Sequence, residues 1–164
     1  MAGWDDLTAA AGPVAERLIA RHETVAVAES SAGGLIAGAL LAVPGASAYF
    51  RGGAVVYTAH AKALLLGKSR EAVTNPRAAT EAHALILAHA VRERLGATWG
   101  IGETGAAGPA GNRYGDPPGH ACIGVAGATG QSRATTVATG ASDREANMFA
   151  FAAAALHLLG DLLA

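Results

Sequence analysis

The chain has 164 residues, enough for one ordinary hydrophobic core, so we expect a single domain over residues 1–164. Only 15% of the residues are charged, and 12 basic against 13 acidic side chains give a net charge of −1, which excludes a broad attraction to nucleic acid. The longest apolar runs, at 35–43 and 148–156, are shorter than the roughly 18 residues that cross a bilayer, so we expect neither nucleic acid nor a membrane as a partner.

The first half of the chain predicts strands separated by helices. A helix is expected from about residue 6 to 21, and Gly12-Pro13 could bend or restart it. A buried strand follows at Thr24–Ala28, and then a helix that Pro44-Gly45 ends. The second strand is expected at Ala54–Thr58.

The second half predicts two capped helices, three strands and a final helix. The first two helices, at 59–66 and 81–95, are capped by Thr58 and Thr80 and end at Gly67 and Gly96. Strands are expected at 98–104, 120–127 and 133–139, followed by a long helix that Asp143 caps.

The order of these elements predicts an α/β fold. Strands that are separated by helices imply parallel crossovers, whereas the short turn between 120–127 and 133–139 implies an antiparallel hairpin. We therefore expect a mixed sheet of about five strands that is covered by helices.

The amino terminus and the metal-binding residue types suggest a cytoplasmic protein without a cofactor. The first residues lack the basic and apolar regions of a secretory signal, and a lone cysteine, Cys122, fits a reducing compartment. The six histidines show no recognisable zinc spacing. We predict no metal and no cofactor.

A polar, glycine-rich stretch, ESSAGG at 29–34, follows the first strand, where ligands gather in α/β sheets. The free amides at the start of the next helix suit a phosphate, and Gly33-Gly34 would let it approach the backbone. The alternative is a capping segment in which Ser30 or Ser31 is the N-cap. Glu29 either orients a substrate amide or simply lies on the loop.

Three side chains around the second strand suggest nucleophilic catalysis: Ser47 as nucleophile, Tyr57 as hydrogen-bond relay and Lys62 as base. Lysine accepts a proton only when it is neutral, which lies roughly 4 to 5 kcal/mol uphill in water at pH 7. Burial in the apolar helix AHAKALLL would have to supply most of that energy. From spacing alone, the alternative is a solvated helix lysine.

A glycine-rich loop after the third strand, residues 105–112, could present backbone amides to an oxyanion. Gly105 and Gly108 would supply the amides, and Thr104 a hydroxyl. The alternative is a flexible connection. Arg51 and Arg113 are candidates for an anionic group of the substrate, although surface solvation is the more common role for an arginine of this kind.

Five ordered motifs together resemble the CinA carboxyl-terminal domain family, which includes stand-alone nicotinamide-nucleotide amidases of the PncC type. The family's motifs are AESCTGG, PGSS, GGVVTYSNEAKAELLG, VSE and TGIAGPDGG. The corresponding stretches here are AESSAGG (28–34), PGAS (44–47), GGAVVYTAHAKALLLG (52–67), ATE (79–81) and TGAAGPAGN (104–112).

The resemblance implies a three-layer α/β/α fold and metal-free deamidation of nicotinamide mononucleotide (NMN) to nicotinate mononucleotide. It also implies an active site of serine, tyrosine, lysine and threonine, which fall on Ser47, Tyr57, Lys62 and Thr104. If Ser47 is not the nucleophile, Ser30 or Ser31 is the next candidate. We favour a homodimer because twofold assemblies are the commonest oligomers.

The chain departs from the family pattern at several positions. The family's Cys-Thr pair is Ser31-Ala32 here, and its Asp and second glycine of PDGG are Ala110 and Asn112. These departures concern the substrate more than the reaction. Two alternatives therefore stay open: an inactive or weak nucleotide-binding relative, and an amidase for another small amide.

Overall fold

The computed structural model describes residues 2–164 and contains a five-stranded sheet of order β2-β1-β3-β4-β5 with helices on both faces. The elements in chain order are α1 (Trp4–Ala20), β1 (Val25–Glu29), α2 (Leu35–Ala42), the 3₁₀ turn η1 (Ala46–Ala48), β2 (Phe50–Val55), α3 (Ala59–Leu66), α4 (Glu81–Leu95), β3 (Trp99–Ala106), β4 (His120–Gly127), β5 (Ser132–Ala138) and α5 (Arg144–Leu163).

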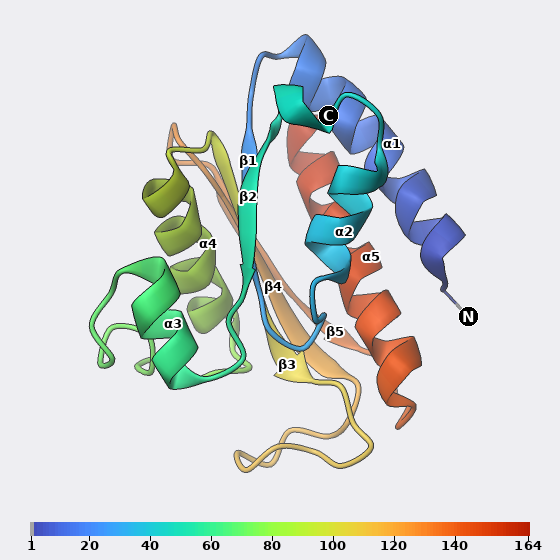
Figure 1. Ribbon diagram of the computed structural model, residues 1–164. Coiled ribbons are helices and arrows are strands. Elements are labelled where there is room, and N and C mark those ends of the chain that lie inside the picture. Colours follow the sequence, from blue (N-terminus) through green and yellow to red (C-terminus); the bar gives the residue numbers. More distant parts are fainter. Residues whose placement is uncertain (1) are drawn as a thin grey trace.

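The strand pairing is mixed. Strand β1 is parallel to β2 and β3, whereas β3 with β4 and β4 with β5 pair antiparallel. Helices α1, α2 and α5 cover one face of the sheet and α3 and α4 the other (Figure 1). The predicted α/β fold with three layers and five strands is confirmed.

Local sequence signals set most of the helix ends as predicted. The side chains of Thr58, Thr80 and Asp143 each accept a hydrogen bond from an amide three residues further on. Gly67 and Gly96 adopt the left-handed conformation that ends a helix. Helix α1 continues through Pro13 without a restart.

Strand β2 begins earlier than predicted, at Phe50 rather than Ala54. The pairing with β1 shifts between Val25 and Ala26, because Arg51 is an extra residue that bulges from the ladder. A Cβ at Gly53 would lie 3.3 Å from the Val27 carbonyl oxygen and 3.2 Å from the Ala37 Cβ. The glycines therefore belong to the strand, and they let α2 approach it closely.

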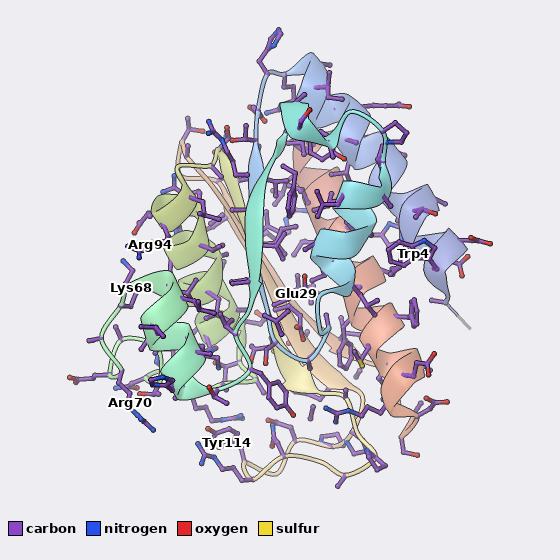
Figure 2. All side chains as sticks on the ribbon, viewed as in Figure 1. Trp4, Glu29, Lys68, Arg70, Arg94 and Tyr114 are labelled. Atoms are coloured by element: carbon purple, nitrogen blue, oxygen red, sulfur yellow. The ribbon has the colours of Figure 1, made fainter. Side chains whose placement is uncertain are left out.

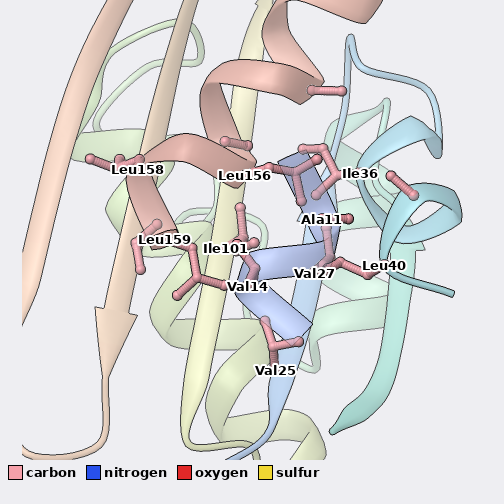
Figure 3. Close-up of a cluster of buried hydrophobic side chains, with 14 of the residues drawn as sticks. Ala11, Val14, Val25, Val27, Ile36, Leu40, Ile101, Leu156, Leu158 and Leu159 are labelled. Atoms are coloured by element: carbon pink, nitrogen blue, oxygen red, sulfur yellow. The ribbon is translucent and has the colours of Figure 1, made fainter. Parts of the chain in front are cut away.

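The larger core lies between the sheet and helices α1, α2 and α5 (Figure 3). Helix α5 has 20 residues and is apolar enough to cross a bilayer by length and composition, which the shorter run at 148–156 did not reveal. In the structure Phe151, Leu156 and Leu159 are fully buried in this core. A smaller core lies beneath α3 and α4.

The topology brings the three loops that follow β1, β2 and β3 to the same edge of the sheet. Helix α2 connects β1 to β2 across one face, and α3 and α4 connect β2 to β3 across the other (Figure 1). Ligands in such sheets bind at the carboxyl ends of the strands where the winding direction changes, which here is between β1 and β3.

Close packing of α4 on β3 gives a test of the fold. A Cβ at Gly100 would lie 2.0 Å from the Ala88 carbonyl oxygen, so Gly100→Ala should lower the free energy of unfolding by about 3 kcal/mol. Gly12, inside α1, has no atom near its Cβ position, and Gly12→Ala should raise that energy by about 0.5 to 1 kcal/mol. Urea unfolding measures both; equal effects would contradict the packing.

Candidate functional site

A buried carboxylate, Glu103 on β3, holds the turn that follows β1. Its oxygens accept hydrogen bonds from the Ser30 and Ala32 amides, both at 2.9 Å, and from the Ser31 hydroxyl. Glu103 is 0% exposed, and burial raises its pKa while these donors and Lys62 lower it. The contact ties the end of β1 to β3.

A second buried carboxylate, Glu29, caps helix α2. It accepts hydrogen bonds from the amides of Gly34 (2.8 Å), Ile36 (3.1 Å) and Ala37 (2.9 Å). Figure 2 shows Glu29 between the sheet and the start of α2. Burial raises its pKa to about 7, and the charge of Glu103 adds to that rise. Glu29 is therefore a helix cap, which corrects its prediction as a substrate ligand.

The predicted phosphate site at this helix start is wrong. Glu29 and Glu103 take the amides that a phosphate would use, and the Gly33 amide bonds to the Ser30 carbonyl at 3.1 Å. Gly33 and Gly34 have φ of 66° and 97°, and a Cβ at Gly33 would lie 2.6 Å from the Met148 Cε. The two glycines serve the turn and its packing. The capping alternative is correct only in part: the segment caps α2, but Gly34 is the N-cap residue and Glu29, not Ser30 or Ser31, accepts the amides.

A polar cavity of about 240 Å³ opens beside α3 and α4. It is lined by two predicted site residues on the helical side, Tyr57 and Lys62, and by Arg113 on the β3–β4 loop, together with Ala59, Val73, Thr74, Ala78, His83 and Tyr114. Figure 2 shows Tyr114 on this loop. The structure thus brings Tyr57, Lys62 and Arg113 to one cavity.

Lys62 is buried at the wall of this cavity, and its Nζ lies 2.9 Å from the Nε2 of His83 on α4. Burial lowers the pKa of Lys62, and the charge of Glu103 opposes that shift. The solvated alternative for this lysine is wrong.

Tyr57 lies at the rim of the cavity and is 60% exposed. Its hydroxyl accepts a hydrogen bond from Nη2 of Arg144 at 3.4 Å, while Nη1 of Arg144 donates to the Gly108 carbonyl at 2.6 Å. A Cβ at Gly108 would lie 2.7 Å from the Ser142 carbonyl oxygen, so this glycine packs against the segment before α5. Arg144 connects the predicted residues Tyr57 and Gly108.

Thr104 lies on β3 as predicted, and because β3 extends to Ala106, Gly105 is also in the strand and not in the predicted loop. The Thr104 Oγ accepts a hydrogen bond from the Ala79 amide at 3.0 Å, which leaves its own proton free to donate. The Ala106 carbonyl faces the β4 side, where it accepts from the Gly119 amide. Since strand amides alternate in direction, the Gly105 amide points toward the β1 side.

The structure separates Ser47 and Arg51 from the other predicted site residues. Both line a different pocket, which includes Thr24 at the start of β1. Ser47 precedes β2 and Tyr57 follows it, so a strand of 6 residues, roughly 20 Å long, lies between them. Figure 1 shows η1 and α3 at opposite ends of the sheet. The grouping of Ser47 with Lys62 is therefore wrong, as is Arg51 as a ligand at that site.

Sequence reasoning missed Glu103 and the contact of His83 with Lys62. A charged residue inside the apolar strand WGIGETGA was a usable signal, because a buried carboxylate needs partners. His83 lies on the buried face of α4, but its partner is 21 residues away along the chain. Within residues 2–164, no three His, Cys, Asp or Glu side chains are grouped so that they could hold a metal ion.

In a comparison with protein families, residues 7–163 match the CinA C-terminal domain. A CinA-like protein of Gloeobacter violaceus is 40% identical over 85% of this chain and 32% of its own length. One of Anaeromyxobacter dehalogenans is 41% identical over 89% of this chain and 35% of its own. The chain thus corresponds to about a third of the length of these curated relatives.

Solved structures match over nearly the whole chain. The competence/damage inducible protein CihA from Agrobacterium tumefaciens is 32% identical with a TM-score of 0.88, over 96% of this chain and 95% of its own. A competence-damaged protein (CinA) superfamily protein from Escherichia coli is 29% identical with a TM-score of 0.88, over 99% and 93%.

The buried position of Glu29 predicts a pH-dependent stability. Its pKa of about 7 in the folded protein exceeds the ordinary 4.5, so the folded state binds the proton more tightly and wild-type stability should fall as pH rises from 4.5 to 7. Glu29→Gln cannot titrate there. The unfolding free energy of wild type minus that of the variant should drop by about 3 kcal/mol between pH 4.5 and 8 in urea titrations. A difference independent of pH would contradict the prediction.

Proposed function

The chain belongs to the CinA C-terminal domain family, and from this premise we propose that it is an amidohydrolase that converts NMN to nicotinate mononucleotide and ammonia. The observation that carries the proposal is the buried Lys62 at the wall of a polar cavity, at the sheet edge where α/β proteins bind ligands. Its lowered pKa favours the neutral amine that general-base catalysis needs.

Ser30 replaces Ser47 as the proposed nucleophile. Along β1 the Ala28 side chain packs in the core beneath α3 and α4, and Glu29 faces α2 on the opposite side. Extending this alternation by one residue beyond the end of β1 supports a position for Ser30 on the same face as Lys62. Ser31 is less suitable, because its hydroxyl donates to Glu103.

The proposed reaction needs one proton relay and one oxyanion site. Neutral Lys62 accepts the Ser30 proton, directly or through Tyr57, as the Ser30 oxygen bonds to the amide carbon. The Gly105 amide and the Thr104 hydroxyl donate to the oxygen that becomes negative. The protonated Lys62 then gives its proton to the departing ammonia, and water releases the nicotinate product from Ser30. No step requires a metal or a cofactor.

The phosphate of NMN is assigned to Arg113 at the cavity rim. The Arg113 guanidinium lies 5.0 Å from the ring centroid of Tyr114, and both side chains line the cavity. An arginine suits a phosphate because its donors match two oxygens. This assignment orients the substrate with its carboxamide at Lys62 and its phosphate toward solvent.

Matched serine variants test the nucleophile. Ser30→Ala should lower kcat for ammonia release from NMN by at least about 10³-fold, because no hydroxyl remains to attack the amide. Ser47→Ala, at the other end of β2, should change the rate less than about twofold. Coupled ammonia assays measure both. Loss of activity in Ser47→Ala alone would sink the assignment of Ser30.

The same assay decides between the proposed reaction and its alternatives. Wild-type activity should survive a chelator. Tight NMN binding without ammonia release would indicate a binding protein, and release from another amide alone would change the substrate.

Two arginine variants test the phosphate position. Arg113→Ala should raise KM for NMN about tenfold with little change in kcat, because the lost contact is equally strong in substrate and transition state. Arg51→Ala removes the same charge at the other edge of the sheet and should leave KM unchanged. Steady-state kinetics compare the variants; an equal rise in KM would show that general charge and not position matters.

A further inference from the structure

His83 has a protonation state that its two contacts fix. Its Nδ1 lies 2.9 Å from the Pro76 carbonyl oxygen, which can only accept a hydrogen bond, so Nδ1 carries the proton. Nε2 then holds a lone pair and accepts from Lys62 Nζ at 2.9 Å. Burial first, and then the charge of Lys62, lower the pKa of His83 to about 4, so the ring is neutral at pH 7.

We propose that His83 is a positioning residue for the catalytic amine: it takes one N–H of Lys62 and thereby turns the amine lone pair toward the Ser30 turn. The inference rests on the proposed function, because it assumes that Lys62 accepts the nucleophile's proton. A neutral amine has two N–H bonds and one lone pair, so fixing one N–H restricts rotation about the Cε–Nζ bond. His83 itself cannot take the proton, because Nε2 is already occupied and the ring is fully buried.

The other polar groups near Lys62 do not provide this restraint. Glu103 affects the pKa of Lys62 through its charge, whereas its oxygens accept hydrogen bonds from the Ser30–Ala32 turn. Tyr57, Arg113 and Tyr114 line the same cavity from the β2–α3 connection and the β3–β4 loop. Among the described side chains, His83 is the one in hydrogen-bond contact with the lysine nitrogen.

Two variants separate the contacts of the ring. In His83→Gln the Oε1 can replace Nε2 as acceptor for Lys62, whereas in His83→Asn the Nδ2 can replace Nδ1 as donor to Pro76 but no acceptor reaches Lys62. We expect His83→Asn to lower kcat about 10²-fold with KM nearly unchanged, and His83→Gln to stay within about fivefold of wild type. Equal activity of the two variants would overturn the inference.

A second measurement needs no substrate. The chain has two lysines, Lys62 and Lys68, so ¹³C-labelled lysine gives two ε-carbon signals whose shifts report protonation. In His83→Asn the Lys62 ammonium loses an acceptor, so its pKa should fall below the wild-type value. Lys68, whose Nζ lies 3.2 Å from the Glu93 Oε2 on α4, gives the second signal and serves as the internal reference in both proteins.

The two readouts distinguish failure of the inference from failure of the proposed function. Ammonia release by wild type together with an unchanged Lys62 titration in His83→Asn would overturn the role of His83 alone. A lowered Lys62 pKa in a protein that releases ammonia from no amide would overturn the proposed function, while the contact between the two side chains would stand.

Discussion

The site depends on the burial of one carboxylate, Glu103. A buried carboxylate is costly unless hydrogen-bond donors surround it, and here the Ser30 and Ala32 amides and the Ser31 hydroxyl supply them. The donors come from the turn after β1 and the acceptor from β3, so the contact fixes how the two strand ends lie relative to each other. The proposed nucleophile and the proposed oxyanion amide of Gly105 lie on these two strand ends.

The two carboxylates beside this turn also bear on where the proposed function can accommodate a nucleotide. Glu29 and Glu103 accept hydrogen bonds from the backbone amides at the end of β1, so these amides are not available to a phosphate. In the proposed function the phosphate of the nucleotide therefore lies at the rim, near Arg113, and its carboxamide lies toward Lys62. Glu103 also restrains the lysine, because its charge opposes the effect of burial on the lysine pKa.

The helix caps, which neighbouring residues determine, were predictable from the sequence. The grouping of the site residues, which depends on strand direction, was not. The caps at Thr58, Thr80 and Asp143 involve residues three apart and were predicted correctly. The assignment of Ser47 to the site was wrong because the order of motifs along the chain does not show strand direction. A strand separates the residues before it from those after it, so they lie at opposite ends of the sheet. Glu103 meets partners more than 70 residues away, which no local pattern reveals.

The departure at Ser31-Ala32 is best explained by this same contact. The resemblance gives the family a cysteine where Ser31 stands, and a thiol is a weaker hydrogen-bond donor than a hydroxyl. A hydroxyl therefore satisfies the buried Glu103 carboxylate better, and Ala32 needs only its backbone amide to contribute. Both residues donate hydrogen bonds to Glu103 inside the protein. Their difference from the family pattern therefore does not require the loss of a contact with the nucleotide. In the proposed reaction, the groups that act at this end of the sheet are then the Ser30 hydroxyl, the Lys62 amine and the Gly105 amide.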